Sequence, residues 1–399
     1  MITRRHVCIG IAGALAAPYA ARAATPPAFS ADFDMFWKTL DEGYCFFDEK
    51  ATDWARVREV YGPRATAAAS PQAFGDVLAL ALNELYDTHT HLSDPPEGSR
   101  RWPPFDLLVA AEGGGARVLE VRTGSAAARA GLAPGVVISA VDGVPVAEAA
   151  AAAMPACLGR RDLAAEAYAL NVAVAGRRGM PRLLRLGSGA ELDLPLLTGA
   201  DEPDISYRWL DGEIGLIRIA SFASMDSIAV FDAALAQLRQ ARGLVLDVRR
   251  NGGGDTAVAR PIMGRFISKE APYAQMRRRE GRGLGPAWIE YVEPRGPFTY
   301  EGPVVVLTDR WSASMAEGFP MGMRGLGRAR IVGRPMMGLG AAVLTIELPN
   351  SGLSLQYSAE PVYDVAGRPR WTMSPDVETQ PGADELAAGL VELWRMIAG

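Results

Sequence analysis

A chain of 399 residues exceeds the length that one hydrophobic core usually stabilises, so we expect two or three domains. Apolar residues make up 49% of the chain and charged residues 22%, which is ordinary for a soluble globular protein. The formal net charge of −5 argues against nucleic acid as a partner, because nucleic-acid-binding proteins usually carry a basic stripe.

The first 23 residues have the pattern of a cleaved export signal. Arg4 and Arg5 supply the charge, an apolar stretch runs from Val7 to Ala17, and Ala21-Arg22-Ala23 is a small-x-small cleavage site. The apolar stretch is too short for a comfortable membrane span, and no later run of about 20 apolar residues exists. We therefore expect a periplasmic or secreted protein without a membrane span, and the paired arginines hint at the twin-arginine route.

Cys45 and Cys157 are the cysteines that remain once the signal is removed. They permit at most one disulfide, and the sequence leaves open whether they pair.

The segment from Ala28 to Leu92 is predicted to be a helical N-terminal domain. Apolar residues recur in it at helical spacing, and Ser70-Pro71 has the form of an N-cap followed by a proline at the first helical position. The segment ends with Tyr86–Leu92, which holds His89 and His91, the only histidines after the signal.

The segment from Pro104 to Leu197 is predicted to be rich in β-structure. An alternating strand pattern covers Ala116–Arg122, a short helix lies within Gly124–Leu132, and a further strand ends in an Asp142-Gly143 turn. The alanine-rich run Ala147–Ala153 is interpreted as a helix.

From Ile205 to Gly399, strands and helices alternate. Continuous apolar strands are predicted at 214–219, 243–248 and 303–308, and an amphipathic helix at 228–238. Continuous apolar strands that alternate with helices indicate a largely parallel sheet covered on both faces.

Two successive crossovers of this sheet carry unusual residues where ligand sites collect in α/β sheets. The first carries Asn251–Gly254, whose glycines let the backbone approach a substrate closely. The second carries Ser314 at a helix start, where backbone amides and the helix dipole favour an oxyanion. Together they predict a nucleophile beside oxyanion donors. The alternative is that Ser314 only caps the helix, in a capping box with Glu317, and that the glycines only form a turn.

A serine nucleophile needs a base, for which His89 and His91 are the candidates. Asp87-x-His89-x-His91 also resembles the metal-binding motif of amidohydrolases. A catalytic zinc needs three protein ligands, however, and no later histidine exists to complete the set. We therefore expect no metal and no other cofactor.

Together these features resemble the C-terminal processing (tail-specific) serine peptidase family, which includes the tricorn-protease core. The motifs that carry the resemblance are Asp87-Thr88-His89-Thr90, Gly124–Leu132 with Val141-Asp142-Gly143, Asp247–Gly254, and Thr308–Glu317. The resemblance implies an α/β multidomain protein: a helical N-terminal region (28–92), a PDZ-like β-rich domain (104–197) and a crotonase/ClpP-like α/β core (205–399).

One departure from the family pattern bears on the mechanism. Ser–Lys members place a lysine between two glycines, where this chain reads Gly338-Leu339-Gly340, and no lysine follows Lys269. The tricorn-like branch instead pairs its serine with a histidine from the upstream element. This resemblance implies Ser314 as the nucleophile and His89, in preference to His91, as the general base.

We expect the N–H groups of Gly253 and Met315 to form the oxyanion hole. Thr88 or Glu317 could orient His89. Further alternatives for that role are Thr90, Glu360 and Asp364. The position of the tricorn glutamate falls near 369–372, where this sequence has no acid.

The prediction is an exported serine peptidase acting on a peptide or protein substrate, whose PDZ-like domain captures a peptide C-terminus at a sheet edge. That domain could instead be a structural insert that shields the active site.

The missing lysine and the unidentified acid leave open a catalytically inactive protein that binds a ligand or peptide on the same scaffold. A crotonase-like acyl-CoA enzyme is a third hypothesis, which the export signal disfavours. The substrate and the oligomeric state are not specified.

Overall fold

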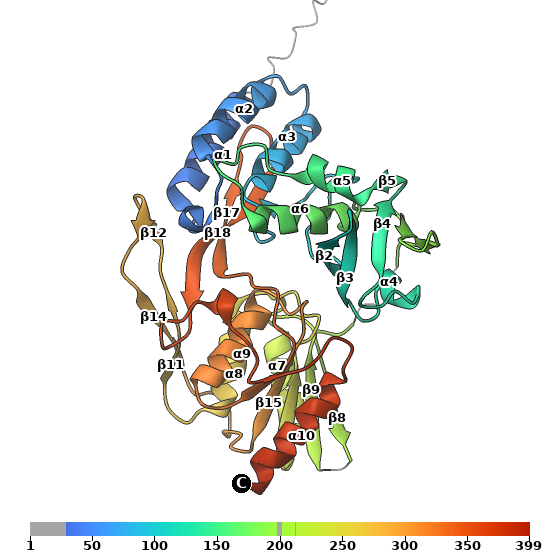
Figure 1. Ribbon diagram of the computed structural model, residues 1–399. Helices are drawn as coiled ribbons and strands as arrows, with labels where there is room; N and C mark the ends of the chain where they lie inside the picture. The colour runs from blue at the N-terminus through green and yellow to red at the C-terminus, as the bar shows by residue number, and fades with distance from the viewer. Residues whose placement is uncertain (1–28, 198–201, 212) are drawn as a thin grey trace, which may run out of the picture.

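The computed structural model describes residues 29–197, 202–211 and 213–399, so the expected export signal lies outside the described residues. Helices at the N-terminus, a middle region and a C-terminal α/β core follow one another along the chain (Figure 1). No helix in the described ranges combines the length and the apolar character that a bilayer crossing requires.

Three helices form the N-terminal region: α1 Phe29–Gly43, α2 Trp54–Thr66 and α3 Pro71–Asn83, with the 3-10 turn η1 Phe47–Glu49. α3 begins as predicted, because Ser70 Oγ accepts a hydrogen bond from Ala73 N–H at 3.1 Å and Pro71 takes the first helical position. The apolar faces of the helices form a shared core, in which Phe36 and Phe74 are fully buried.

The middle region is built on a six-stranded antiparallel sheet in the order β2-β3-β4-β6-β7, with β5 paired to β4. Its strands are β2 Leu107–Glu112, β3 Gly115–Val121, β4 Val137–Val141, β5 Val144–Pro145, β6 Arg182–Leu186 and β7 Glu191–Leu194. Its helices are α4 Ala126–Arg129, α5 Val146–Ala153 and α6 Leu163–Ala175. The predicted turn is present, with positive φ at Asp142 and Gly143.

The core contains a six-stranded sheet in the order β19-β16-β15-β10-β9-β8, parallel throughout except for β8. Its strands are β8 Ile205–Leu210, β9 Ile214–Ile219, β10 Gly243–Asp247, β15 Val304–Thr308, β16 Arg330–Gly333 and β19 Val377–Glu378. Helices α7 Ser227–Gln237, α8 Thr256–Met263 and α9 Met315–Gly325 cover one face, and α10 Glu385–Ala398 covers the other. The predicted parallel sheet, covered on both faces, is therefore confirmed.

A five-stranded sheet joins the N-terminal region to the core. Its strands are β1 His91–Leu92, β11 Ala271–Met276, β14 Trp288–Val292, β17 Ala341–Glu347 and β18 Ser354–Tyr363. His91 lies opposite Gln356 of β18, and Leu348, Leu355 and Tyr357 complete the core of the N-terminal helices. The β17–β18 hairpin thus leaves the segment that we expected to belong wholly to the core, and it reaches the helical region (Figure 1).

The remaining elements are short. They are the β12–β13 ribbon (Arg279–Glu280 and Gly283–Leu284) and the 3-10 turns η2 Gly264–Phe266 and η3 Arg370–Thr372.

Candidate active site

Two loops leave the same edge of the core sheet, because β10 and β15 are parallel neighbours. They are bonded to each other: Ser312 Oγ donates to Val248 O and Ala313 N–H donates to Asn251 O, both at 2.9 Å. The predicted meeting of the glycine loop and the helix-start serine is therefore present in the structure.

Ser314 precedes α9 in a strained backbone conformation. Its φ and ψ are 54° and −116°, outside the extended region that a helix N-cap normally adopts, and this costs on the order of 1–3 kcal/mol. The residue is partly exposed, and its N–H donates to the Glu317 carboxylate at 2.9 Å. The capping box with Glu317 is present. The cap alone does not explain the positive φ, since an ordinary N-cap has none.

Gly253 lies directly against Ser314. A methyl group at Gly253 would fall 2.8 Å from Ser314 Cβ and 3.0 Å from the Met315 nitrogen, and its φ of +106° disfavours any side chain. Its N–H donates to Asn251 Oδ1 at 2.7 Å, and the fully buried Asn251 amide donates in turn to Ile219 O. Met315 is the first residue of α9, so its N–H has no acceptor within the helix. The expected oxyanion donors thus sit side by side, and one of them is engaged by Asn251.

His89 lies buried in the loop between α3 and β1. The backbone N–H of His89 donates to Asp87 Oδ1 at 2.9 Å. The Asp87 carboxylate also accepts from the hydroxyls of Thr90 and Ser358. Burial lowers the pKa of His89 to about 4, the negative charge of Asp87 opposes this, and Arg370 reinforces it. The imidazole is therefore neutral near pH 7, and its buried Nδ1 has no hydrogen-bond partner among the described residues.

Arg370 links His89 to the start of α9. Its charge lowers the pKa of both His89 and Glu317, and its Nη1 lies 3.4 Å from the Cβ position of Gly318. Its guanidinium donates to the carbonyls of Leu339 and Ala341. Within the described ranges no hydrogen bond joins Ser314 Oγ to either imidazole. Arg370 therefore acts electrostatically on both His89 and Glu317 of the serine loop, while Ser314 and His89 are not hydrogen-bonded to each other in the described structure.

Glu317 is a buried carboxylate that holds two loops together. It accepts hydrogen bonds from the N–H groups of Ser314, Gly338 and Leu339. Burial raises its pKa to about 7, and the charge of Arg370 opposes this shift. The carboxylate therefore fastens the Gly338-Leu339-Gly340 segment to the serine, and it makes no hydrogen bond to His89 in the described structure.

The other candidates for orienting His89 also have partners elsewhere. Thr88 Oγ1 donates to Pro103 O. Glu360 pairs with Arg278, and Asp364 pairs with Arg368 at 2.7 Å. Thr90 bonds to Asp87, and so acts on the loop of His89 and not on its imidazole.

His91 occupies a different environment from His89. Its Nδ1 lies 2.8 Å from Leu92 O, and its ring stacks on Trp102 with the centroids 3.5 Å apart. It lines a cavity of about 290 Å³ that reaches Tyr168 of α6. Of the two histidines, only His89 is coupled electrostatically to Arg370.

Sequence reasoning missed Arg370 and the loop-shaping role of Asn251. Arg370 lies in the 369–372 stretch where we looked for an acid. Only the structure distinguishes it, because its side chain is nearly buried, with 5% of its surface exposed. Cys45 and Cys157 are buried and unpaired.

Comparison with known proteins adds a family assignment to this geometry. Residues 213–379 match peptidase family S41, and residues 26–83 match the tricorn protease C1 domain. The carboxy-terminal processing protease CtpB of Bacillus subtilis is 31% identical over 129 residues, 32% of this chain and 25% of that protein. The carboxy-terminal-processing protease of Bartonella bacilliformis is 26% identical over 239 residues, 57% of this chain and 49% of that protein. The chain thus matches a quarter to a half of the length of these curated relatives.

Solved structures share the fold. The photosystem II D1 C-terminal processing protease superposes with a TM-score of 0.58 at 20% identity, over 92% of this chain and 97% of that one. Mature CPAF superposes with a TM-score of 0.61 at 14% identity, over 92% and 96% of the two chains. The mixed α/β multidomain architecture is therefore one found among solved processing proteases.

Proposed function

The chain belongs to the C-terminal processing serine peptidase family, and we propose that it hydrolyses peptide bonds with Ser314 as the nucleophile and His89 as the general base. The observation that carries the proposal is the contact between Gly253 and the strained Ser314, 2.8 Å from the Gly253 Cβ position to Ser314 Cβ. A nucleophile pressed against glycine backbone at a helix N-terminus suits attack on a carbonyl and stabilisation of the oxyanion that forms.

In this mechanism Ser314 Oγ attacks the scissile carbonyl carbon while its proton passes to the neutral imidazole of His89. The C–N bond then breaks, the leaving amine takes that proton, and water hydrolyses the acyl-enzyme. Met315 N–H is available to the oxyanion, whereas Gly253 N–H must first release Asn251 Oδ1, its present acceptor at 2.7 Å. His89 must also close on Ser314, a tightening that catalytic hydrogen bonds often undergo when substrate binds.

We further propose that the middle region is a PDZ-like module that holds an extended peptide along β2, one of the two edge strands of its sheet. A cavity of about 700 Å³ lies beside this strand, between the β2–β3 hairpin and apolar residues of α5 and α6. The side-chain amide of Asn171 already bonds to the edge of β2 at Val109. It accepts from Val109 N–H at 3.0 Å and donates to Val109 O at 3.1 Å. Peptide must displace Asn171 there or bind beside it.

A binding protein without turnover is the second candidate. The absence of a hydrogen bond from Ser314 to either imidazole and the engaged N–H of Gly253 favour it. Turnover of a panel of peptides and esters separates the two functions: the peptidase predicts hydrolysis that falls at least about 10³-fold in Ser314→Ala. Hydrolysis of the whole panel at the same rate by Ser314→Ala would reject the peptidase.

Export remains part of the proposal on the strength of the first 23 residues alone. The N-terminal residue of the mature protein, read by mass spectrometry, tests it: a chain that retains Met1 in the exporting host would contradict it.

A further inference from the structure

The junction between the middle region and the core is rich in arginine, and part of that charge is neutralised. Glu120 of β3 is buried, and it pairs with Arg310 at 3.4 Å and with Arg334 at 3.2 Å. Both arginines belong to the core, so this carboxylate fastens the middle region to it.

A second group of arginines at the same junction is only partly paired with carboxylates. A cavity of about 460 Å³ is lined by Arg122, at the end of β3, and by Arg250 of the core, together with three further arginines: Arg101, Arg129 and Arg182. Arg250 Nη1 lies 3.7 Å from the Cβ position of Gly124, in the loop that follows Arg122. Burial lowers the pKa of Arg122, the negative charge of Asp309 opposes this, and the positive charge of Arg250 reinforces it.

Among the described residues, the carboxylates around this cavity already have hydrogen-bond or ion-pair partners. Asp106 pairs with Arg182 at 2.5 Å, and Glu202 pairs with Arg218 at 2.9 Å. Asp309 Oδ1 accepts hydrogen bonds from Arg250 N–H, Trp311 N–H and Ser312 Oγ. Among the described residues neither Arg122 nor the Arg250 side chain forms an ion pair.

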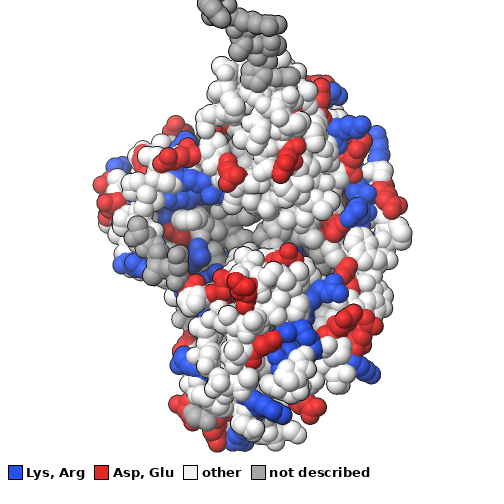
Figure 2. Space-filling model, turned by 180° about the vertical axis from the view of Figure 1, so that it is seen from behind, with Lys and Arg blue, Asp and Glu red and all other residues white. Residues whose placement is uncertain are grey.

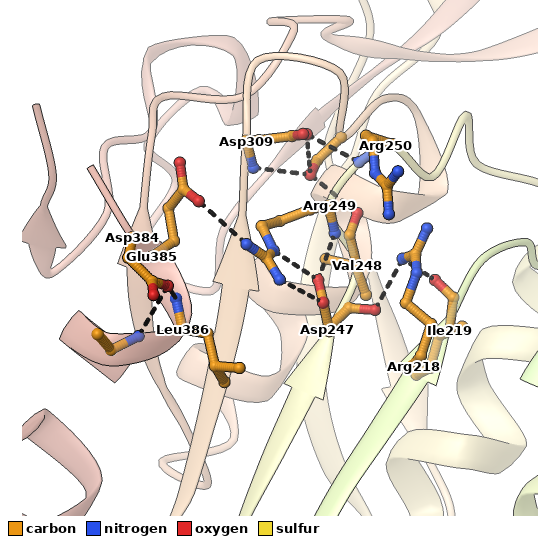
Figure 3. Close-up of polar contacts among 12 residues, drawn as sticks. Arg218, Ile219, Asp247, Val248, Arg249, Arg250, Asp309, Asp384, Glu385 and Leu386 are labelled. Carbon is orange, nitrogen blue, oxygen red and sulfur yellow. Dashed lines mark hydrogen bonds and ion pairs between the residues drawn. The ribbon is translucent and has the colours of Figure 1, made fainter. Parts of the chain in front are cut away.

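Arg249, the residue before Arg250, has a guanidinium that is fully paired with carboxylates. Arg249 is held between Asp247, at 2.7 Å, and Glu385, at 3.0 Å, whereas the guanidinium of Arg250 stands apart from that network (Figure 3). Lys and Arg side chains also gather on the side of the middle region next to the hollow between the two halves of the molecule (Figure 2). The charges of Asp309 and Asp106 act on Arg122, but neither Arg122 nor the Arg250 side chain forms an ion pair among the described residues. Two such arginines lining one cavity point to an anion supplied from outside.

We propose that Arg122 and Arg250 bind a carboxylate of the peptide substrate, either its C-terminus or an acidic side chain. This inference rests on the proposed function, because a peptide lying between the middle region and Ser314 passes this junction. Guanidinium forks match a carboxylate with paired hydrogen bonds. Arg250 directly precedes the Asn251–Gly253 loop, so the bound carboxylate lies next to the backbone that must supply an oxyanion donor.

The test measures fluorescence anisotropy of labelled peptides on the full chain carrying Ser314→Ala, which prevents cleavage. One sequence is used in three forms: with a free C-terminus, with a C-terminal amide, and with its internal Glu replaced by Gln. At least one neutralised form is expected to bind about tenfold more weakly than the free peptide, and which one identifies the carboxylate. Arg122→Gln with Arg250→Gln should abolish this discrimination.

Arg208→Gln with Arg282→Gln is the matched control, since both residues are exposed and the same charge is removed. It should leave the discrimination intact. Arg122→Lys with Arg250→Lys, which keeps the charge but loses the forks, should give an intermediate ratio and guards against misfolding of the glutamine pair. Equal binding of all three peptides, or discrimination that persists in the glutamine pair, overturns the inference. If the protein discriminates between the peptides but shows no Ser314-dependent hydrolysis, the carboxylate-binding site is supported and the peptidase function is rejected.

Discussion

At the scale of single residues, the site depends on a close approach that only glycine permits. Gly253 adopts φ +106° and faces Ser314 Cβ, Ala313 O and the Met315 nitrogen within 3.0 Å of its Cβ position. By contrast, nothing lies within 4 Å of the Cβ position of Gly252, the preceding residue. The two glycines therefore have different roles.

Gly253→Ala is expected to lower kcat/KM and to destabilise the fold by about 1–3 kcal/mol, because the methyl group collides with the nucleophile and the backbone is strained. Peptide hydrolysis and urea denaturation measure the two effects. Gly252→Ala serves as the control and should cost much less in both. Similar losses in the two variants would show that the loop does not press on Ser314.

The buried His89 makes stability depend on pH in a defined direction. Its folded-state pKa of about 4 lies below the usual 6.5, so between these values the unfolded chain binds more protons. The stability of the folded state therefore loses the contribution of His89 as the pH falls from about 6.5 toward 4. The difference in unfolding free energy between wild type and His89→Ala should shrink by about 2 kcal/mol from pH 7 to pH 5 in urea denaturation. A difference that is independent of pH would mean that the imidazole is solvated in the folded protein.

The meeting of Ser314 with the glycine loop was predictable, because the carboxyl ends of adjacent parallel strands share one edge. The engagement of Gly253 N–H by Asn251 was not, because it depends on a side-chain conformation that no residue pattern encodes. Arg370 was missed for a similar reason: it lies in a short 3-10 turn without periodicity, and its burial comes from distant segments.

At the scale of elements, α6 both covers the middle sheet and closes part of its edge. Asn171 is mostly buried and pairs with both backbone groups of Val109, as a neighbouring strand would. An edge strand that is satisfied in this way is protected from unwanted pairing. It also competes with any peptide that would add to β2.

Asn171→Ala should strengthen binding of an extended peptide to the Ser314→Ala protein, because the edge of β2 becomes free at Val109. It should also destabilise the fold by about 1–3 kcal/mol, since two buried backbone groups lose their partner. Fluorescence anisotropy and urea denaturation test both effects. Asn83→Ala is the control: it removes a hydrogen bond to Ala153 and leaves β2 untouched. Weaker peptide binding in Asn171→Ala would contradict the role of a competitor.

Elements with strong local signals were predictable. Ser70-Pro71 marked the start of α3, and apolar runs marked β9, β10 and β15. α6 was not predicted, because its buried residues are spread around the helix and give no single apolar stripe. The pairing of β18 with β1 was not predicted, since the two strands lie more than 200 residues apart in the chain.

At the scale of the whole molecule, the site is formed by segments that lie far apart in the chain. β18 pairs with the His-bearing β1 at one end and with β11 of the core, which contacts α9, at the other. Ser358 of this strand donates to the Asp87 carboxylate at 2.8 Å, in the loop that holds His89. The arrangement of the site is therefore set by long-range strand pairing that no local sequence pattern reveals.

The central claim is that Ser314 is a nucleophile activated by His89. Reaction with a fluorophosphonate probe, followed by mass spectrometry of proteolytic fragments, tests it most directly. If His89 activates Ser314, a single adduct is expected on Ser314, with a marked loss of labelling rate in His89→Ala and a near wild-type rate in His91→Ala. Labelling that persists unchanged in Ser314→Ala, or that falls equally in the two histidine variants, would contradict it.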